Sequence, residues 1–155
     1  MGSEFGVRSS ELWVESSGFG ELFTGPNTGG NMKISGFEEI ESWKEARLLT
    51  QNVYRITATP RFSRDFGLKD QIQRASVSIM ANIAEGFDAG SGRSFITFLS
   101  YAYRSAAEVQ SLLFVVLDVG YIQQSEFQAI FGQALKTKKL IGGLMRYLRG
   151  SNPRH

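Results

Sequence analysis

Four long stretches of the chain carry apolar residues at every third or fourth position, the spacing that places them on one face of a helix. The stretch from Phe66 to Gly86 shows this pattern over its whole length. Its apolar line comprises Leu68, Ile72, Ala75, Ile79 and Ile83. Beside that line runs a second row, which we call the polar stripe and which comprises Gln71, Arg74, Ser78, Asn82 and Glu85. The pattern predicts an amphipathic helix with Gly86 as its left-handed C-cap.

Three further helices are predicted from the same spacing. The first spans about residues 37–57 and stops before Pro60, because proline cannot continue a helix. The third spans about residues 93–119 and ends at Gly120. The last begins at Ser125, whose hydroxyl can cap the first turn. Four helices of about 20 residues joined by short turns predict an all-α, antiparallel up-down-up-down four-helix bundle.

The third predicted helix carries two apolar faces. Its core face comprises Phe95, Phe98, Leu99, Ala102, Ala106, Val109, Leu113 and Val116. A second apolar set lies a quarter to a third of a turn away and comprises Ile96, Tyr103, Ala107 and Phe114. One bundle core rarely needs two such faces on one helix, and an exposed second face would be an unusual apolar patch. We therefore predict that this set forms the interface of a closed homo-oligomer, with tighter packing inside one chain as the alternative.

The chain divides into three predicted parts: a flexible leader at residues 1–31, a bundle domain at 32–150 and a C-terminal tail at 151–155. The opening sequence Met1 to Phe5 resembles a cloning scar, and little helical or strand periodicity follows it. The leader is therefore interpreted as partly vector-derived, with a native disordered extension as the alternative.

The charges are unevenly distributed. The chain has 17 Lys and Arg residues against 15 Asp and Glu residues. Four of the acids but only one of the bases lie in residues 1–31, which leaves 16 bases against 11 acids in the rest. From Phe127 to the C-terminus there is no acidic residue. This asymmetry suggests a negatively charged partner.

The basic residues of the last predicted helix share one broad side, away from its apolar residues: Lys136, Lys138, Lys139, Arg146 and Arg149. Such a face, repeated around an oligomer, predicts binding of RNA or DNA that weakens steeply with salt. A solvated face that keeps the protein soluble is the alternative. The polar stripe also allows two interpretations. It either lines a groove or pore and hydrogen-bonds a ligand, or its groups satisfy one another and neighbouring backbone at a helix or subunit boundary.

Several chemistries are excluded by the composition. The sequence has no Cys, so disulfides and thiolate metal sites are excluded, and its only His is His155 near the C-terminus. Glu85 and Glu108 could pair as acid and base, although a structural contact is the favoured explanation. We expect no catalytic activity, no metal and no cofactor. No run of about 18 apolar residues could span a membrane, and a cytoplasmic location fits the composition.

With the helices placed, the sequence resembles a known bacterial family. The clearest block is the ordered series FGL at 66–68, QIQRASVSI at 71–79 and ANIAEG at 81–86, with shorter matches between Trp43 and Tyr121. It resembles the four-helix-bundle family named after proteins encoded in intervening sequences of 23S ribosomal RNA genes. The resemblance implies a bundle that assembles as a ring, commonly a homopentamer, and no catalytic activity is established for the family. It also implies kinship with accessory proteins of diversity-generating retroelements, which bind nucleic acid and a reverse transcriptase through a basic barrel.

Residues and resemblance together predict a non-enzymatic homo-oligomeric scaffold that binds RNA or DNA through the basic side of its last helix. The resemblance adds a reverse transcriptase or another nucleic-acid enzyme as a candidate partner. The alternative function is a protein–protein interaction adaptor that does not bind nucleic acid.

Overall fold

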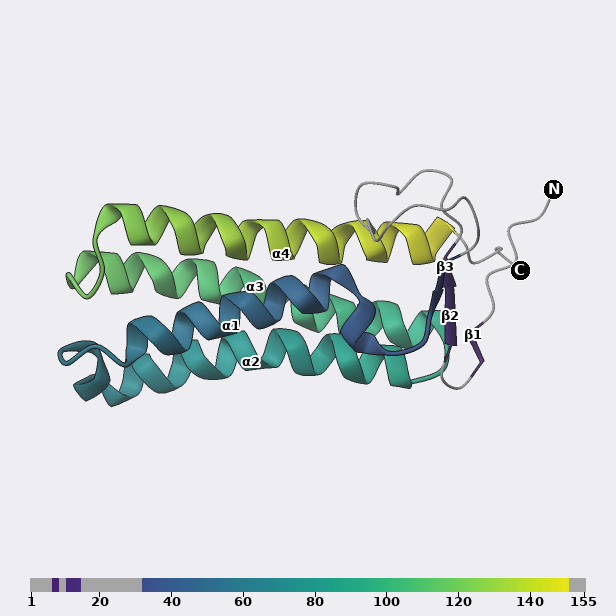
Figure 1. Cartoon of the computed structure of the whole chain (residues 1–155), viewed down its shortest axis with the longest axis horizontal. Coiled ribbons are helices and arrows are strands. Elements are labelled where there is room, and N and C mark those ends of the chain that lie inside the picture. Colours follow the sequence, from purple (N-terminus) through teal and green to yellow (C-terminus); the bar gives the residue numbers. More distant parts are fainter. Residues whose placement is uncertain (1–6, 9–10, 15–31, 151–155) are drawn as a thin grey trace.

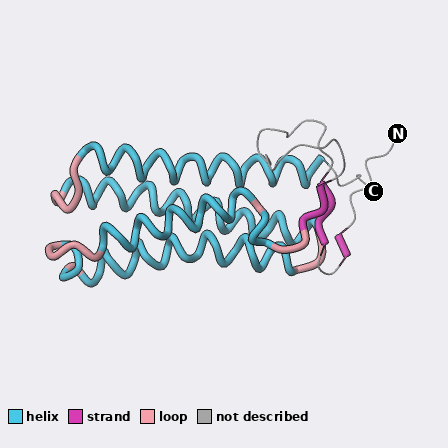
Figure 2. Tube along the Cα trace, viewed as in Figure 1, coloured by secondary structure: helices cyan, strands magenta, loops and turns pink. Residues whose placement is uncertain are grey.

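The computed structural model describes residues 7–8, 11–14 and 32–150. Four helices account for most of them and lie side by side along one axis (Figure 1). They are α1 (Glu41–Thr57), α2 (Phe66–Asp88), α3 (Gly92–Asp118) and α4 (Gln124–Gly150). The α1–α2 and α3–α4 connections lie at one end of the bundle and the α2–α3 connection at the other (Figure 2), so successive helices run antiparallel. The predicted antiparallel arrangement of four helices is confirmed.

A small antiparallel sheet precedes the helices in the sequence. It consists of β1 (Val7–Arg8), β2 (Glu11–Val14) and β3 (Met32–Ile34), paired in that order, with Leu12 opposite Ile34. Ile34 is buried and belongs to the core cluster of the bundle. β1 and β2 lie within the predicted leader at 1–31, where the sequence had indicated no strand. The rest of the leader and the tail at 151–155 lie outside the described residues, so the predictions made for them stay predictions.

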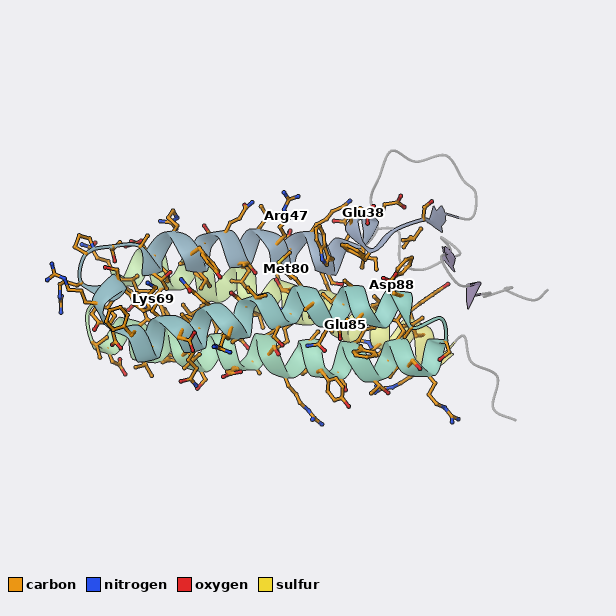
Figure 3. The ribbon with its side chains drawn as sticks, turned by 90° about the horizontal axis from the view of Figure 1, so that it is seen from below. Glu38, Arg47, Lys69, Met80, Glu85 and Asp88 are labelled. Atoms are coloured by element: carbon orange, nitrogen blue, oxygen red, sulfur yellow. The ribbon has the colours of Figure 1, made fainter. Side chains whose placement is uncertain are left out.

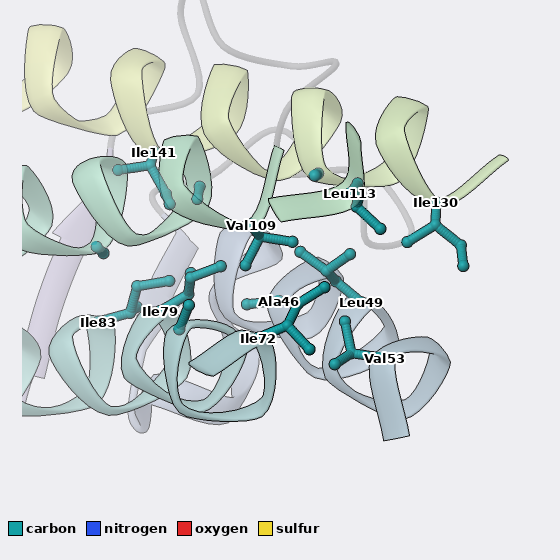
Figure 4. Close-up of a cluster of buried hydrophobic side chains, with 14 of the residues drawn as sticks. Ala46, Leu49, Val53, Ile72, Ile79, Ile83, Val109, Leu113, Ile130 and Ile141 are labelled. Atoms are coloured by element: carbon teal, nitrogen blue, oxygen red, sulfur yellow. The ribbon is translucent and has the colours of Figure 1, made fainter. Parts of the chain in front are cut away.

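The core forms where the predicted apolar faces of the four helices meet (Figure 4). Each helix contributes side chains that are fully buried, among them Leu49, Val53, Ile79, Ile83, Leu99, Leu113 and Ile141. Burying an aliphatic side chain of this size stabilises the fold by about 1.5–3 kcal/mol relative to leaving it exposed. Helical spacing alone therefore located most of the interior of the bundle. Phe98, predicted on the core face of α3, is only partly buried and lies outside the core cluster, with its Cβ atom against Gly86 of α2.

Gly86 is not the C-cap that the sequence suggested. α2 continues to Asp88, and the left-handed conformation occurs at Gly90, with φ of +78°. Gly86 is instead buried against α3: a Cβ atom there would lie 2.7 Å from Phe95 Cδ2 and 2.8 Å from Phe98 Cβ. The absent side chain thus allows α2 and α3 to approach closely, and α3 then starts with Ser91 as its N-cap.

Two predicted helix starts also shift. The segment Phe37–Glu39 forms the short 3-10 helix η1, and the extended backbone of Ile40 separates it from α1. α4 begins at Gln124, which places Ser125 inside the first turn and not at the cap. The cap position is weakly specified by the sequence, because neighbouring polar residues satisfy the same pattern.

Asp65 ties the two connections at one end of the bundle together. Its Oδ1 atom accepts a hydrogen bond of 3.2 Å from the backbone N–H of Leu68 and caps α2, while its Oδ2 atom accepts one of 2.9 Å from the Tyr121 hydroxyl. The Tyr121 ring stacks on Phe62, in the 3-10 helix η2 (Phe62–Arg64), with 4.8 Å between ring centroids. The hydrogen bond to Asp65, followed by desolvation and the nearby carboxylate charge, raises the pKa of Tyr121 above its usual value.

Candidate nucleic-acid interface

A groove of about 910 Å³ lies between α3 and α4 on the outside of the bundle. We call it the α3–α4 groove. Half of its lining residues are Lys or Arg and none is acidic; it is lined by Ser100, Tyr103, Arg104, Leu135, Lys138, Lys139, Gly142, Met145, Arg146 and Arg149. The groove therefore combines a concentrated positive charge with a lining surface that is mostly apolar.

Helical spacing brings these residues onto one surface. On α4 the lining positions run from Leu135 to Arg149 in steps of one or three residues, which keeps them on one broad side. On α3, Ser100, Tyr103 and Arg104 have the same spacing. Because α3 and α4 pack against each other as neighbours, the two sets face a common seam.

Tyr103 lies at the centre of this arrangement. A Cβ atom at Gly142 would be 3.6 Å from Tyr103 Cε2, an ordinary contact distance, so the ring lies directly against the backbone of α4. Lys138 Nζ is 4.9 Å from the ring centroid and also donates a hydrogen bond of 3.4 Å to Gln110 Oε1. A cation above an aromatic face is attracted by the ring quadrupole. Tyr103 still leaves 39% of its surface exposed.

The five residues of the predicted basic side of α4 do not all lie on one surface. Lys138, Lys139, Arg146 and Arg149 line the groove. Lys136 does not: its Nζ atom donates a hydrogen bond of 2.8 Å to Glu45 Oε1 on α1. That hydrogen bond and the charge of Glu45 raise the pKa of Lys136 above its usual value.

Arg104 is the groove residue that the sequence did not reveal. It comes from α3 and lies directly after Tyr103. Its side chain joins a basic surface whose other cations all come from α4. Arg104 follows Ser100 by four residues, so the sequence does show that the two share a face of α3. Only the antiparallel pairing of α3 with α4 brings Arg104 opposite the cations of α4.

The second apolar set of α3 lies along the same seam. Ile96 is partly buried and packs against the core, and Phe114 contacts Phe127 and Phe131 of α4, with ring centroids 5.0 and 5.5 Å apart. Phe114 nevertheless leaves 50% of its surface exposed, while Ala107 is partly buried. Part of the set is thus packed inside one chain, and its contact with a second copy stays a prediction.

The polar stripe on α2 mostly bonds within the chain. Ser78 Oγ lies 3.0 Å from Ser105 Oγ on α3, and Asn82 Nδ2 donates to the Ser78 carbonyl at 2.8 Å. Gln71 Nε2 donates to Glu108 Oε1 at 3.4 Å, and Arg74 pairs with Asp70 at 2.8 Å. The Ser78 and Gln71 bonds connect α2 to α3, whereas those of Asn82 and Arg74 stay within α2. Together they favour the interpretation in which polar groups are satisfied within the protein at a helix boundary.

Glu85 and Glu108 do not form an acid–base pair. Glu108 contacts Gln71 near the start of α2, whereas Glu85 lies near its end and is exposed (Figure 3). Fourteen helical residues separate those two positions of α2, or about 21 Å at 1.5 Å per residue. The two carboxyl groups are therefore too far apart to act on one bond.

Two shallower hollows follow the polar stripe, with volumes of about 470 and 610 Å³. Both are lined by carboxylates as well as by Arg74, so neither has the uniform positive charge of the α3–α4 groove.

Among the described residues, no group of three or more His, Cys, Asp or Glu side chains is arranged to hold a metal ion. No helix in the described part of the chain is both long and apolar enough to cross a bilayer.

The sequence model of the 23S rRNA-intervening sequence proteins matches residues 38–143, which include α1, α2, α3 and most of η1 and α4. The protein belongs to the 23S rRNA-intervening sequence protein family. The family match takes in Tyr103, Arg104, Lys138 and Lys139 of the groove but ends before Met145, Arg146 and Arg149.

The fold of this 23S rRNA-intervening sequence protein is similar to a solved structure. That structure is a protein with unknown function from the S23 ribosomal protein family of Bacteroides thetaiotaomicron VPI-5482. The two chains superpose with a TM-score of 0.63 at 23% sequence identity, over 68% of this chain and 98% of the other. No curated protein gives a significant match.

Proposed function

We propose that the protein is a non-enzymatic nucleic-acid-binding module that holds RNA or DNA in the α3–α4 groove. The observation that carries this proposal is the set of five cations, four from α4 and Arg104 from α3, in a groove whose lining contains no carboxylate. Nucleic acid is the common biological polymer whose charge density matches such a surface, and its affinity comes largely from phosphate contacts.

The groove cations are available for a partner. The ion pairs found among the described residues are Lys44–Glu41, Arg55–Glu126, Arg74–Asp70 and Lys136–Glu45. None of them involves a residue of the groove. Like charges held close together repel one another unless a counter-charge is bound, so a polyanion would stabilise this arrangement.

The scaffold part of the proposal rests on the other end of the same seam. Phe114, Val115 and Val119 leave 50%, 44% and 45% of their surfaces exposed. Self-association through this end of α3, and not through Tyr103 as the sequence suggested, would leave the groove uncovered and multiply the number of grooves in one particle. A ring of five copies, as the family resemblance implies, would then bind one strand at several grooves with increased avidity. A reverse transcriptase or another nucleic-acid enzyme is the partner proposed for such a scaffold.

The proposal predicts a steep salt dependence. We expect the protein to bind a labelled mixed-sequence RNA of 20 nucleotides more weakly as NaCl is added. The logarithm of the binding constant should fall linearly with the logarithm of the NaCl concentration. If three to five groove cations contact phosphates, the slope should lie between about −2 and −3.5 per groove occupied. Fluorescence anisotropy titrations at four salt concentrations measure it.

A slope near zero, or no binding at low salt, would contradict this function. In that case the adaptor alternative, with a polypeptide as the partner, would become the better explanation of the exposed surfaces.

A further inference from the structure

We infer that the α3–α4 groove takes a single strand of nucleic acid, and that one base of the strand stacks on the face of the Tyr103 ring that Lys138 does not cover. This inference rests on the proposed function and adds the form of the ligand to it. It is carried by the position of an exposed aromatic ring among cations that form no ion pair within the described residues, which phosphate binding alone does not require.

The Tyr103 ring is held in place before any ligand binds. The backbone of Gly142 lies against one edge of the ring, and the ammonium group of Lys138 lies 4.9 Å from its centroid. The hydrogen bond from Lys138 to Gln110 restrains that ammonium group in turn. A stacking platform that is already ordered loses little conformational entropy on binding, which favours affinity.

Apolar surface next to the ring supports a base in the groove. Leu135 leaves 37% of its surface exposed, and Met145 also lines the groove. A phosphate backbone has no favourable contact with such side chains, whereas the face of a base does. The combination of a cationic groove with an aromatic platform is the arrangement by which proteins bind single strands.

The dimensions of the seam disfavour a duplex. Axes of packed helices lie about 8–10 Å apart. A DNA duplex is broader than this spacing, since its major groove alone is about 12 Å wide, so it would lie across the rim of the α3–α4 groove. Its bases would remain stacked on one another, out of reach of Tyr103, and only its phosphates could contact the rim.

The lining also predicts weak sequence preference. Its side-chain hydrogen-bonding groups are cations and the hydroxyls of Ser100 and Tyr103, without an Asn, Gln, Asp or Glu side chain. The bidentate contacts that identify adenine and the contacts that identify cytosine use those missing residue types, which leaves guanine, bound by Arg or Lys, as the one base that hydrogen bonds from this lining can distinguish. Stacking accepts every base, so the bound strand should be recognised as single-stranded more than by its sequence.

The test compares three probes of equal length on the wild-type protein: a mixed-sequence single strand, its duplex, and a single strand of abasic spacers with the same phosphates. We expect the abasic strand to bind about 5- to 100-fold more weakly than the strand with bases, and the duplex to bind more weakly than the single strand. Tyr103→Leu should weaken binding of the single strand by a similar factor and leave binding of the abasic strand unchanged. Tyr103→Phe, which keeps the ring, should retain the affinity within about twofold.

The wild-type comparison does not depend on the folding of any variant, and circular dichroism checks the fold of the two Tyr103 variants. Equal affinity for the strands with and without bases, or for duplex and single strand, would overturn the inference and leave the groove proposal standing. Polyglutamate of equal charge binding as tightly as the single strand would also overturn it. Failure of all three nucleic-acid probes to bind would overturn the proposed function together with the inference.

Discussion

Reversing two charges in the α3–α4 groove should reduce the affinity for nucleic acid by about 100-fold or more at low salt. The variant is Lys139→Glu combined with Arg146→Glu. Both side chains line the groove and both are exposed, so neither is needed for the core. The change removes two cations and places two carboxylates where phosphates are proposed to bind, which adds repulsion to the loss of attraction.

A matched control carries the same change in net charge on the other side of the bundle. Arg47→Glu combined with Lys69→Glu alters one residue on α1 and one on α2, both outside the groove (Figure 3). We expect this variant to bind within about threefold of the wild type, because its charges act from beyond a Debye length of about 8–10 Å. Anisotropy titrations at one fixed salt concentration compare the three proteins. Equal losses in both variants would show that net charge, and not the groove, determines binding.

Replacing Gly86 by alanine should destabilise the fold by about 1–3 kcal/mol, although alanine is the better helix former. The added methyl group would lie 2.7 Å from the Phe95 ring and 2.8 Å from Phe98 Cβ. Phe98 Cβ is attached directly to the backbone of α3, so it cannot move aside by a change of rotamer. The two helices would therefore have to separate along a buried contact.

Replacing Gly132 on α4 by alanine should have the opposite effect on stability. No atom lies within 4 Å of a Cβ placed there, and the residue is exposed within a helix. Gly132→Ala should therefore stabilise the protein by up to about 1 kcal/mol through helix propensity alone. Urea unfolding of the two variants and the wild type gives both free energies of unfolding. A stabilising effect of Gly86→Ala would contradict the close approach of α2 and α3 described above.

The helices and their buried faces were predictable from the sequence because both depend on local spacing. The apolar line of α2 and the core face of α3 follow the 3.6-residue period without interruption. The role of Gly86, in contrast, could not be predicted from its neighbours in the sequence. A glycine near the end of a helix suits both a left-handed cap and a close helix contact, and only the position of Phe95 and Phe98 on α3 distinguishes the two.

The candidate site was predictable in part for the same reason. Lys138, Lys139, Arg146 and Arg149 share a side of one helix, so a helical wheel finds them. Lys136 was assigned to that side because the wheel does not show Glu45 reaching from α1. Arg104 was missed because its neighbours in space come from α4. The register between two antiparallel helices is a tertiary property that the spacing within each helix does not determine.

The most direct test of the groove as the nucleic-acid site is protection of individual lysines from acetylation, measured by mass spectrometry with and without a saturating single-stranded RNA. Binding in the groove predicts that Lys138 and Lys139 become at least about fivefold less reactive as the RNA excludes the reagent, while Lys44, Lys69 and Lys136 keep their reactivity. Lys136 is the informative internal control, because it lies on the same helix but pairs with Glu45 outside the groove. Protection of Lys136 or Lys69 without protection of Lys138 and Lys139 would contradict the proposed site.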